Sequence, residues 1–289
     1  MIVQKNRHLE AATAILGNKR QAKALLHTLE PRAGDSYQFV VMNRGQIDLA
    51  LLLVHNAGET TTCLVTPPKM DGEIERTSKL IRTAIEPLRV GSIKLAQTLM
   101  EVDQPLLANA YEDAGFTKLA ILTYMERSKS IKLDDVPSGK VTFVSMLERT
   151  DELLQTTLLE SYIGSLDCPK IHGLRHIKDI VEGHRNQGTY DAQLWTIAEL
   201  GGVPVGVLLL SPIPEATCME LSYLGVIPSA RGKGVGDALM HLAIEQTSEN
   251  GLSRIVLAVD SANSPAGALY QRWKFRATRQ RLSMIQKLY

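Results

Sequence analysis

A glycine-rich turn, RGKGVG at residues 231–236, most strongly limits the folds that are open to this chain. It lies between a strand pattern, CMELSYLGVIP, and a helical pattern, DALMHLAIEQTSENG. Glycines 232, 234 and 236 lack a Cβ atom, so the backbone can turn tightly and bring its N–H groups against a phosphate. The helix that follows adds unpaired N–H groups and the positive end of its dipole. The pattern therefore predicts an anion-binding turn within a mixed α/β domain.

The spacing of these glycines excludes two common phosphate-binding turns. There is no G-x-G-x-x-G, as dinucleotide-binding folds require, and no G-K-[S/T] at the distance found in a P-loop. Taken alone, the turn also fits a plain connection from strand to helix with solvated Arg231 and Lys233. The patterns on either side of the turn must therefore decide between the two interpretations.

Those patterns predict an α/β protein of two segments. The chain has 289 residues, more than one compact core usually holds. A polar stretch with Pro and Gly, RSKSIKLDDVPSG at residues 127–139, is the predicted linker between residues 1–126 and 140–289. In the second segment we expect helices over about 150–162 and 172–185, two strands joined at Gly201 and Gly202, the strand and helix around the turn, and a closing helix and strand.

The first segment repeats this plan. In ANAYEDAGF, Tyr111 stands five residues before Phe116, as Tyr270 stands five residues before Phe275 in ALYQRWKF. Two diverged copies of one unit are the economical interpretation, with a chance match of short segments as the alternative. After its matching strand the first copy reads TPPKMDGEIE, where the prolines lack N–H donors. No phosphate-binding turn is expected there.

The amino-acid composition limits the classes of partner that this chain is expected to bind. With 32 basic and 31 acidic side chains the formal net charge is +1, which gives no strong overall field for nucleic acid or anionic lipid. The apolar stretches are too short for a membrane span, and no signal core opens the sequence, so we expect a cytoplasmic protein. Three separate cysteines argue against a disulfide framework. Cys168, His172 and His176 share one side of an expected helix, but we expect no metal site, because such spacing also arises without metal.

The stretch from about Trp195 to Phe275 resembles the GCN5-related N-acetyltransferase (GNAT) superfamily. The family signature R/Q-x-x-G-x-G/A reads here as RGKGVG, preceded by a strand that ends V-x-P at Val226 and Pro228. Asn263, then Leu269-Tyr270 and a closing Phe275 follow in the family's order, whereas Lys274 stands where the family usually has Gly. The resemblance implies two tandem GNAT-like domains, each a mixed, mostly antiparallel sheet flanked by helices, in a layout similar to mycothiol synthase-like proteins.

The resemblance also implies a cosubstrate, acetyl-CoA, and a role for each matching residue. The cofactor-binding residues would be Leu224 and Val226 beside the pantetheine arm, Asn263 on the same arm, and Arg231, Gly232, Lys233, Gly234, Val235 and Gly236 around the pyrophosphate. Tyr270 matches the tyrosine that protonates the departing thiolate. Glu220 resembles the strand glutamate that accepts the amine proton, with Ser222 or a water relay as alternatives. We expect Glu220, Ser222, Leu224 and Val226 to share one face of their strand.

Two functions remain open at this point. The first is an N-acetyltransferase that moves acetyl to a primary amine by direct attack in a ternary complex, the acceptor being a small molecule, a peptide amino terminus or a lysine. The second is an acetyl-CoA-binding sensor with little turnover. The presence of both Glu220 and Tyr270 favours the enzyme. Because the first copy lacks the turn, Tyr111 and Asp103 are expected to be relics of the fold.

Overall fold

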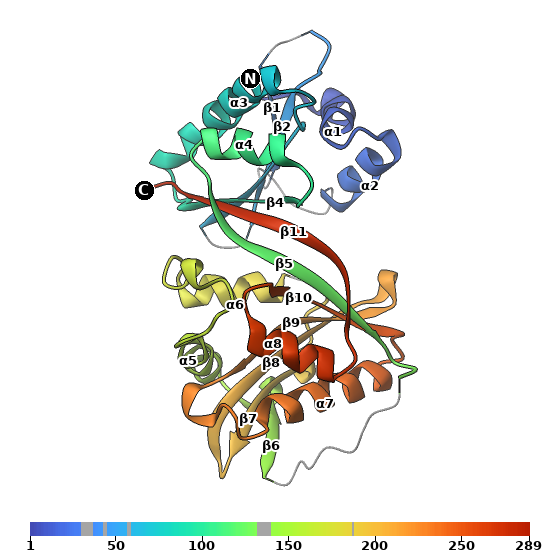
Figure 1. Cartoon of the computed structure of the whole chain (residues 1–289), viewed down its shortest axis with the longest axis vertical. Coiled ribbons are helices and arrows are strands. Elements are labelled where there is room, and N and C mark those ends of the chain that lie inside the picture. Colours follow the sequence, from blue (N-terminus) through green and yellow to red (C-terminus); the bar gives the residue numbers. More distant parts are fainter. Residues whose placement is uncertain (30–36, 43–44, 57–58, 132–139, 187) are drawn as a thin grey trace. The chain divides into compact units, whose positions relative to one another are not determined.

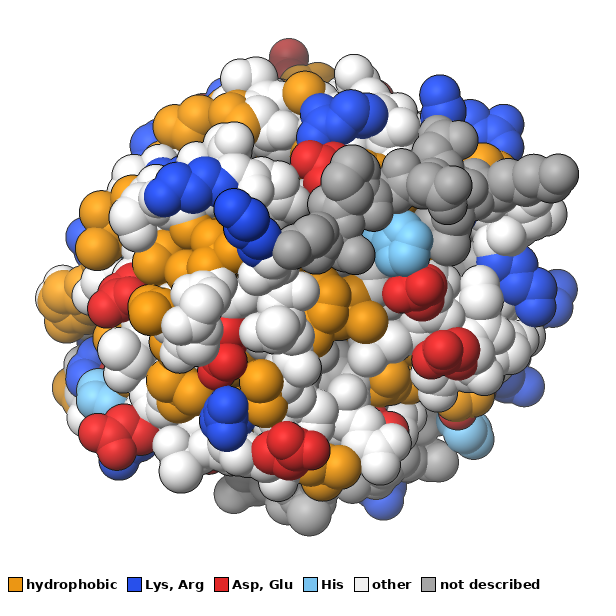
Figure 2. All heavy atoms as spheres, turned by 90° about the horizontal axis from the view of Figure 1, so that it is seen from below, with side chains coloured by type: hydrophobic (Ala, Val, Ile, Leu, Met, Phe, Trp, Pro, Cys, Tyr) orange, Lys and Arg blue, Asp and Glu red, His pale blue; other side chains and the backbone are white. Residues whose placement is uncertain are grey.

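The computed structural model describes residues 1–29, 37–42, 45–56, 59–131, 140–186 and 188–289. The chain forms two compact units, Met1–Ala120 together with Arg281–Tyr289, and Ile121–Gln280. Both are mixed α/β, as the sequence predicted (Figure 1). On the face drawn in Figure 2, Lys and Arg side chains are interspersed with Asp and Glu. In the described part of the chain, no helix has the length and apolar character needed to cross a membrane.

The first unit is a five-stranded sheet with helices on both sides. Its strands run in the order β1-β2-β3-β4-β11, and only the β3/β4 pair is parallel. Its elements are η1 Lys5–Arg7, α1 His8–Leu16, α2 Lys19–Leu29, β1 Tyr37–Val41, β2 Ala50–His55, β3 Thr60–Val65, η2 Asp71–Glu73, α3 Ile74–Ile85, η3 Glu86–Val90, β4 Leu95–Glu101 and α4 Pro105–Asp113.

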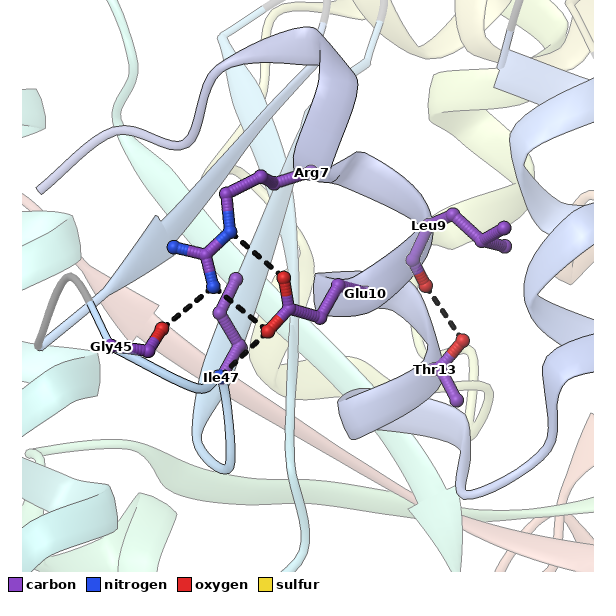
Figure 3. A network of polar contacts seen from close by, with 6 residues as sticks. All are labelled: Arg7, Leu9, Glu10, Thr13, Gly45 and Ile47. Atoms are coloured by element: carbon purple, nitrogen blue, oxygen red, sulfur yellow. Dashed lines mark hydrogen bonds and ion pairs between the residues drawn. The ribbon is translucent and has the colours of Figure 1, made fainter.

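Strand β2 contributes side chains to the hydrophobic clusters on both faces of this sheet. Successive side chains of a strand point to opposite faces, so the continuous apolar run of β2 supplies both cores. Leu51 and Leu53 pack in one cluster with Ile81 of α3, and Leu52 packs in the other with residues of α1. Figure 3 shows how α1 is tied to the loop before β2: Arg7 donates hydrogen bonds to the carboxylate of Glu10 and to the Gly45 carbonyl, and Glu10 accepts one from the Ile47 N–H.

The second unit is a six-stranded sheet in the order β5-β10-β9-β8-β7-β6. The β9/β10 pair is parallel and the other pairs are antiparallel. Its elements are β6 Val141–Ser145, η4 Met146–Glu148, α5 Asp151–Tyr162, η5 Pro169–Ile171, α6 Ile177–Arg185, η6 Ala192–Leu194, β7 Trp195–Leu200, β8 Val203–Ile213, η7 Pro214–Ala216, β9 Cys218–Val226, η8 Pro228–Ala230, α7 Val235–Glu249, β10 Arg254–Asp260 and α8 Ser264–Arg272.

Strand β8 separates two cores in the second unit. Leu208 and Leu210 pack in the cluster that includes Leu239 of α7. Val207 and Leu209 point the other way and pack in the cluster that includes Leu158 of α5. The sheet is therefore covered by α7 and α8 on one face and by α5 and α6 on the other, and a site that opens between its strands is reached from both layers.

Two long strands, β5 Thr117–Ser128 and β11 Arg276–Lys287, each have residues in both units. The part of β5 from Leu122 to Ser128 pairs with β10, in the second unit. The last seven residues of β11 pair with β4, in the first. The predicted linker 127–139 begins inside β5, and its residues 132–139 lie outside the described part of the chain. The predicted domain boundaries, residues 1–126 for the first copy and 140–289 for the second, stay a prediction.

The repeated segments Tyr111–Phe116 and Tyr270–Phe275 have the same hydrogen bond at the end of their helices. Phe116 N–H donates to the Tyr111 carbonyl at 2.9 Å, and Phe275 N–H donates to the Tyr270 carbonyl at 2.9 Å. The residue between helix and phenylalanine takes a positive φ in each case, +94° at Gly115 and +63° at Lys274. This is the usual way in which a helix ends with a left-handed residue. The unusual Lys274 therefore occupies a position that favours glycine.

We expect Lys274→Gly to stabilise the protein by about 0.5 to 1 kcal/mol. The substitution removes about 1–2 kcal/mol of strain, because an L-residue is strained in the left-handed conformation. Part of this gain is cancelled, because glycine gives the unfolded chain more conformational entropy. Thermal and denaturant unfolding measure the difference. Lys287→Gly, at the end of β11, serves as the control and should not stabilise. A Lys274→Gly protein that unfolds more easily than the parent would contradict this account.

Candidate active site between strands β9 and β10

The parallel pair β9 and β10 separates part of the way along its length. Arg254, Ile255 and Val256 pair with Cys218, Met219 and Glu220, after which the register ends although both strands continue. A cavity of about 120 Å³ opens between the separated ends. It is lined by Ser161, Ser165, Asp167, Leu221, Ser222, Tyr223, Leu224, Gly225, Val226, Ala258, Val259, Asn263, Ala266 and Tyr270.

A β-bulge in β9 shapes one wall of this cavity. Leu221 pairs with Leu210 and Tyr223 pairs with Leu209, which leaves Ser222 as an extra residue outside the register, although its hydroxyl is hydrogen-bonded to that of Ser211 on β8. The bulge reverses the alternation of side chains. Leu224 therefore packs with the cluster of Met219 and Leu221, on the α7 face. The prediction that Glu220, Leu224 and Val226 share one face is wrong, because it assumed a regular strand.

Gly225 makes room for the side chains beside the bulge. A Cβ atom at this position would lie 2.7 Å from the Ser161 hydroxyl oxygen and would also meet the Tyr223 hydroxyl. Those two hydroxyls are hydrogen-bonded to each other at 2.6 Å. The absence of a side chain at Gly225 thus lets α5 and β9 approach at the wall of the cavity.

The glycine-rich turn leads into α7 as predicted. Gly232 and Gly234 have φ values of +74° and +81°, and Gly234 is the residue before the first helical turn. Cβ atoms on either glycine would have nothing within 4 Å, so the turn faces open space. The first N–H groups of α7 have no partner inside the helix. Val235 is buried against the core, and Lys233 is exposed. The turn therefore presents N–H groups, the exposed side chain of Lys233 and the positive end of a helix.

The side chain of Arg231 is hydrogen-bonded within the protein, and its predicted place around the pyrophosphate stays a prediction. Its guanidinium donates hydrogen bonds to the carbonyls of Ser161, Ile163 and Gly164, at the end of α5, and to the Val226 carbonyl. A cation at the carboxyl end of a helix is favoured by the helix dipole. With these four contacts, Arg231 ties the end of α5 to the end of β9, two elements whose residues line the cavity.

Tyr270 lies on α8 and lines the cavity from the side opposite to β9. The side chain is only 6% exposed, and burial raises the pKa of the phenol, with the Asp167 charge adding to the rise. Its hydroxyl makes no hydrogen bond within the described residues. Its counterpart Tyr111 donates a hydrogen bond to the Cys63 carbonyl at 2.9 Å. Of the two matching tyrosines, only Tyr270 holds its proton free for a ligand.

Asn263 and Glu220 lie at two edges of the site. The side-chain oxygen of Asn263 accepts a hydrogen bond from Ala266 N–H and so caps α8, while the residue lines the cavity. Glu220 is the last residue of β9 that pairs with β10, and it does not belong to the cavity lining. Burial raises the pKa of Glu220 above its usual value. The sequence interpretation of Glu220 as the group that accepts the amine proton stays a prediction.

The sequence analysis missed Asp167, Ser161 and Tyr223. Ser161 is the penultimate residue of α5, and Asp167 follows in the loop to α6, which carries no recognisable motif. A run of small and polar residues, SYIGSLDCPK, gave no periodic signal that could place them. Tyr223 was hidden by the bulge, because regular alternation assigns it to the wrong face.

The loop after α5 also corrects the predicted helix at residues 172–185. Helix α6 starts at Ile177, because His176 serves as its cap and accepts a hydrogen bond from Lys178 N–H through Nδ1. Cys168 precedes the short η5, and His172 follows it and stacks on Tyr162 at 5.1 Å between ring centres. The three residues therefore do not share a helix face. Within the described residues, no group of three or more His, Cys, Asp or Glu side chains has a metal-binding arrangement.

Comparison with known sequences finds similarity in this unit. Residues 163–275 match the family described as Acetyltransferase (GNAT) family. A mycothiol acetyltransferase of Beutenbergia cavernae is 36% identical over 85 residues, 28% of this chain and 28% of that protein. One from Renibacterium salmoninarum is 43% identical over 65 residues, 22% of this chain and 19% of that protein. The aligned parts thus span less than a third of either relative.

Comparison with solved structures extends over both units. A GCN5-related N-acetyltransferase from Sphaerobacter thermophilus has a TM-score of 0.65 at 16% identity, over 98% of this chain and 91% of that chain. A tandem GNAT protein from the clavulanic acid biosynthesis pathway has a TM-score of 0.56 at 14% identity, over 100% of this chain and 98% of that chain. At these identities the likeness shows the fold, which is the tandem arrangement predicted from the sequence.

Proposed function

We propose, because residues 163–275 match the acetyltransferase (GNAT) family, that this chain is an N-acetyltransferase that moves acetyl from acetyl-CoA to a primary amine. The observation that carries the proposal is the cavity between the separated ends of β9 and β10, which Tyr270 lines and whose β9 wall leads through the glycine-rich turn into α7. The proposal includes a cytoplasmic protein, in keeping with three free cysteines.

The residues around the cavity fit acetyl-CoA. The pyrophosphate suits the N–H groups at residues 232–236 and the positive end of α7, with Lys233 as an added cation. The pantetheine arm suits the cavity itself, where Leu224 and Val226 lie beyond the last residue of β9 that pairs with β10, and where the Val226 carbonyl already accepts a hydrogen bond from Arg231. Asn263 has an amide nitrogen beyond the oxygen that caps α8. Arg231 supports this site indirectly, through its bonds to the end of α5.

In the proposed reaction an amine attacks the acetyl carbonyl directly, in a ternary complex. Acetyl-CoA supplies an activated acetyl group and a thiolate leaving group. Tyr270 donates the proton that the departing thiolate takes up, and its raised pKa keeps that proton on the phenol at neutral pH. The backbone N–H groups at the bulge, freed from β8 around Ser222, would polarise the acetyl carbonyl.

Release of free thiol from acetyl-CoA in the presence of amines tests the function. The panel is a cysteine amine, as the mycothiol acetyltransferase relatives suggest, glucosamine, a peptide amino terminus and lysine. We expect release with at least one amine, together with an acetylated product of the expected mass. Tight acetyl-CoA binding without amine-dependent release from any member would favour the sensor instead.

A further inference from the structure

Among the described residues, Asp167 is the only carboxylate that lines the cavity of the candidate site. It lines the cavity together with Tyr270 on α8 and Tyr223 on β9, although it comes from the loop between α5 and α6. The neighbouring Glu220, which the sequence favoured, does not line the cavity. A group that takes a proton from a reacting amine must reach that amine within the site.

The loop and the end of β10 hold Asp167 in place by reciprocal hydrogen bonds. Asp167 Oδ1 accepts one from the Asp260 N–H at 3.1 Å, and Asp260 Oδ2 accepts one from the Cys168 N–H at 3.1 Å. Cys168 has a φ of +46°, an uncommon value for a residue other than glycine. Such strain persists only where the surroundings fix the backbone firmly.

The second carboxylate oxygen of Asp167, Oδ2, accepts no hydrogen bond from the described residues. A half-buried carboxylate with an open oxygen in a cavity offers both a charge partner for an ammonium and a site for a proton. Burial is the main cause of a raised pKa at Asp167. A raised pKa makes the carboxylate a better proton acceptor.

The titratable groups around Asp167 come from every element that surrounds it. They are Tyr162 of α5, Cys168 and His172 of the loop, Tyr223 of β9, Asp260 of β10 and Tyr270 of α8. The Asp260 carboxylate raises the pKa of Asp167, whereas the charged form of His172 lowers it. Asp260 is already occupied by the N–H groups of Cys168 and Ala262. Asp167 thus has the carboxylate oxygen that is open to a substrate.

We propose that Asp167 binds the acceptor as its ammonium form and takes the proton that the amine must lose before it attacks. This inference rests on the proposed acetyl transfer. The ammonium gives one proton to Asp167 Oδ2, and its freed lone pair forms the N–C bond to the acetyl carbon as the C–S bond breaks. The leaving sulfur takes the proton of Tyr270. The new amide nitrogen loses a second proton, which restores the phenol, and Asp167 releases the first to water.

The test uses the full chain with Asp167→Asn, because the amide oxygen can still accept the bond from Asp260 N–H. With the amine that gives the fastest thiol release, kcat/KM should fall by about 10²- to 10⁴-fold, as for loss of a general base. Affinity for acetyl-CoA, measured by calorimetry, should stay within about threefold, less than 1 kcal/mol. Affinity of the CoA-bound protein for the amine should fall by at least about tenfold, as for loss of a charge-assisted hydrogen bond. Asp179→Asn on α6 is the matched control and should match the parent.

A pH profile adds a measurement that a purely structural role would not change. In the parent, kcat/KM should fall as pH falls through the pKa of Asp167, which lies above that of an ordinary aspartate. That limb should vanish in Asp167→Asn. An Asp167→Asn protein within fivefold of the parent, or one that loses acetyl-CoA affinity in step with its rate, would overturn the role of Asp167. If the parent itself releases no thiol with any amine, the proposed function fails first.

Discussion

Replacement of Tyr270 by phenylalanine is expected to lower kcat by about 10²- to 10⁴-fold, equal to about 3–5 kcal/mol of transition-state stabilisation. The ring and its packing against Phe275 remain, and only the hydroxyl is lost. Because that hydroxyl makes no hydrogen bond within the described residues, its removal leaves no donor or acceptor unpaired. Stability and acetyl-CoA affinity should therefore change little.

Steady-state kinetics and calorimetry on the same preparations separate the effect on chemistry from the effect on binding. Tyr111→Phe is the matched control, since it makes the same change in the first copy. There the hydroxyl does have a partner, the Cys63 carbonyl, so Tyr111→Phe should cost stability and leave kcat unchanged. If Tyr270→Phe instead turns over at the parent rate across the pH range while Glu220→Gln is impaired, the proton reaches the thiolate from water or another group.

Gly236→Asp is expected to abolish detectable acetyl-CoA binding, which in the parent should occur once per chain. A negative charge within about 4 Å of a phosphate costs up to about 4 kcal/mol near a protein surface, close to a thousandfold in affinity. The fold should survive, because a Cβ at this position lies 3.6 Å from the nearest atom, in Leu269. Calorimetry with acetyl-CoA measures the loss.

Gly236→Asn distinguishes charge from bulk, because it has the same shape and no charge. We expect it to retain far more affinity than Gly236→Asp. Gly234→Pro should also abolish binding, since proline cannot adopt the φ of +81° found there. Undiminished binding by a folded Gly236→Asp protein would remove the turn from the acetyl-CoA site, and a second equivalent of bound acetyl-CoA would show that the first copy binds too.

The sequence predicted those parts of the site that depend on local backbone rules. A glycine pattern between strand and helix predicts the turn at Gly234, and the equal spacing of Tyr270 and Phe275 and of Tyr111 and Phe116 predicts two copies of one unit. Features that depend on packing between distant elements were not predictable in this way. Arg231 contacts carbonyls nearly seventy positions earlier in the chain, and Asp167 reaches the cavity because its loop is tied to Asp260.

The bulge in β9 illustrates a different limit. Alternation assigns faces correctly as long as each residue has one partner, and a single extra residue, Ser222, reverses every assignment after it. The sequence carries one sign of this bulge, Gly225, because an isolated glycine inside a strand pattern often marks a bulge. Bulges occur preferentially next to active sites, so alternation predicts the faces of side chains least well in strands that carry functional residues.

Strands β5 and β11 each have residues in both units, and this limits how such a gene can evolve. A chain that ended at residue 126 would lack the seven residues of β11 that pair with β4, and a chain that began at 140 would lack the β5 residues that pair with β10. Neither half of the reading frame specifies a complete sheet. Deletion, or recombination with one half of a homologue, would leave edge strands open to aggregation. A first copy without a catalytic turn can thus be maintained by selection on folding alone.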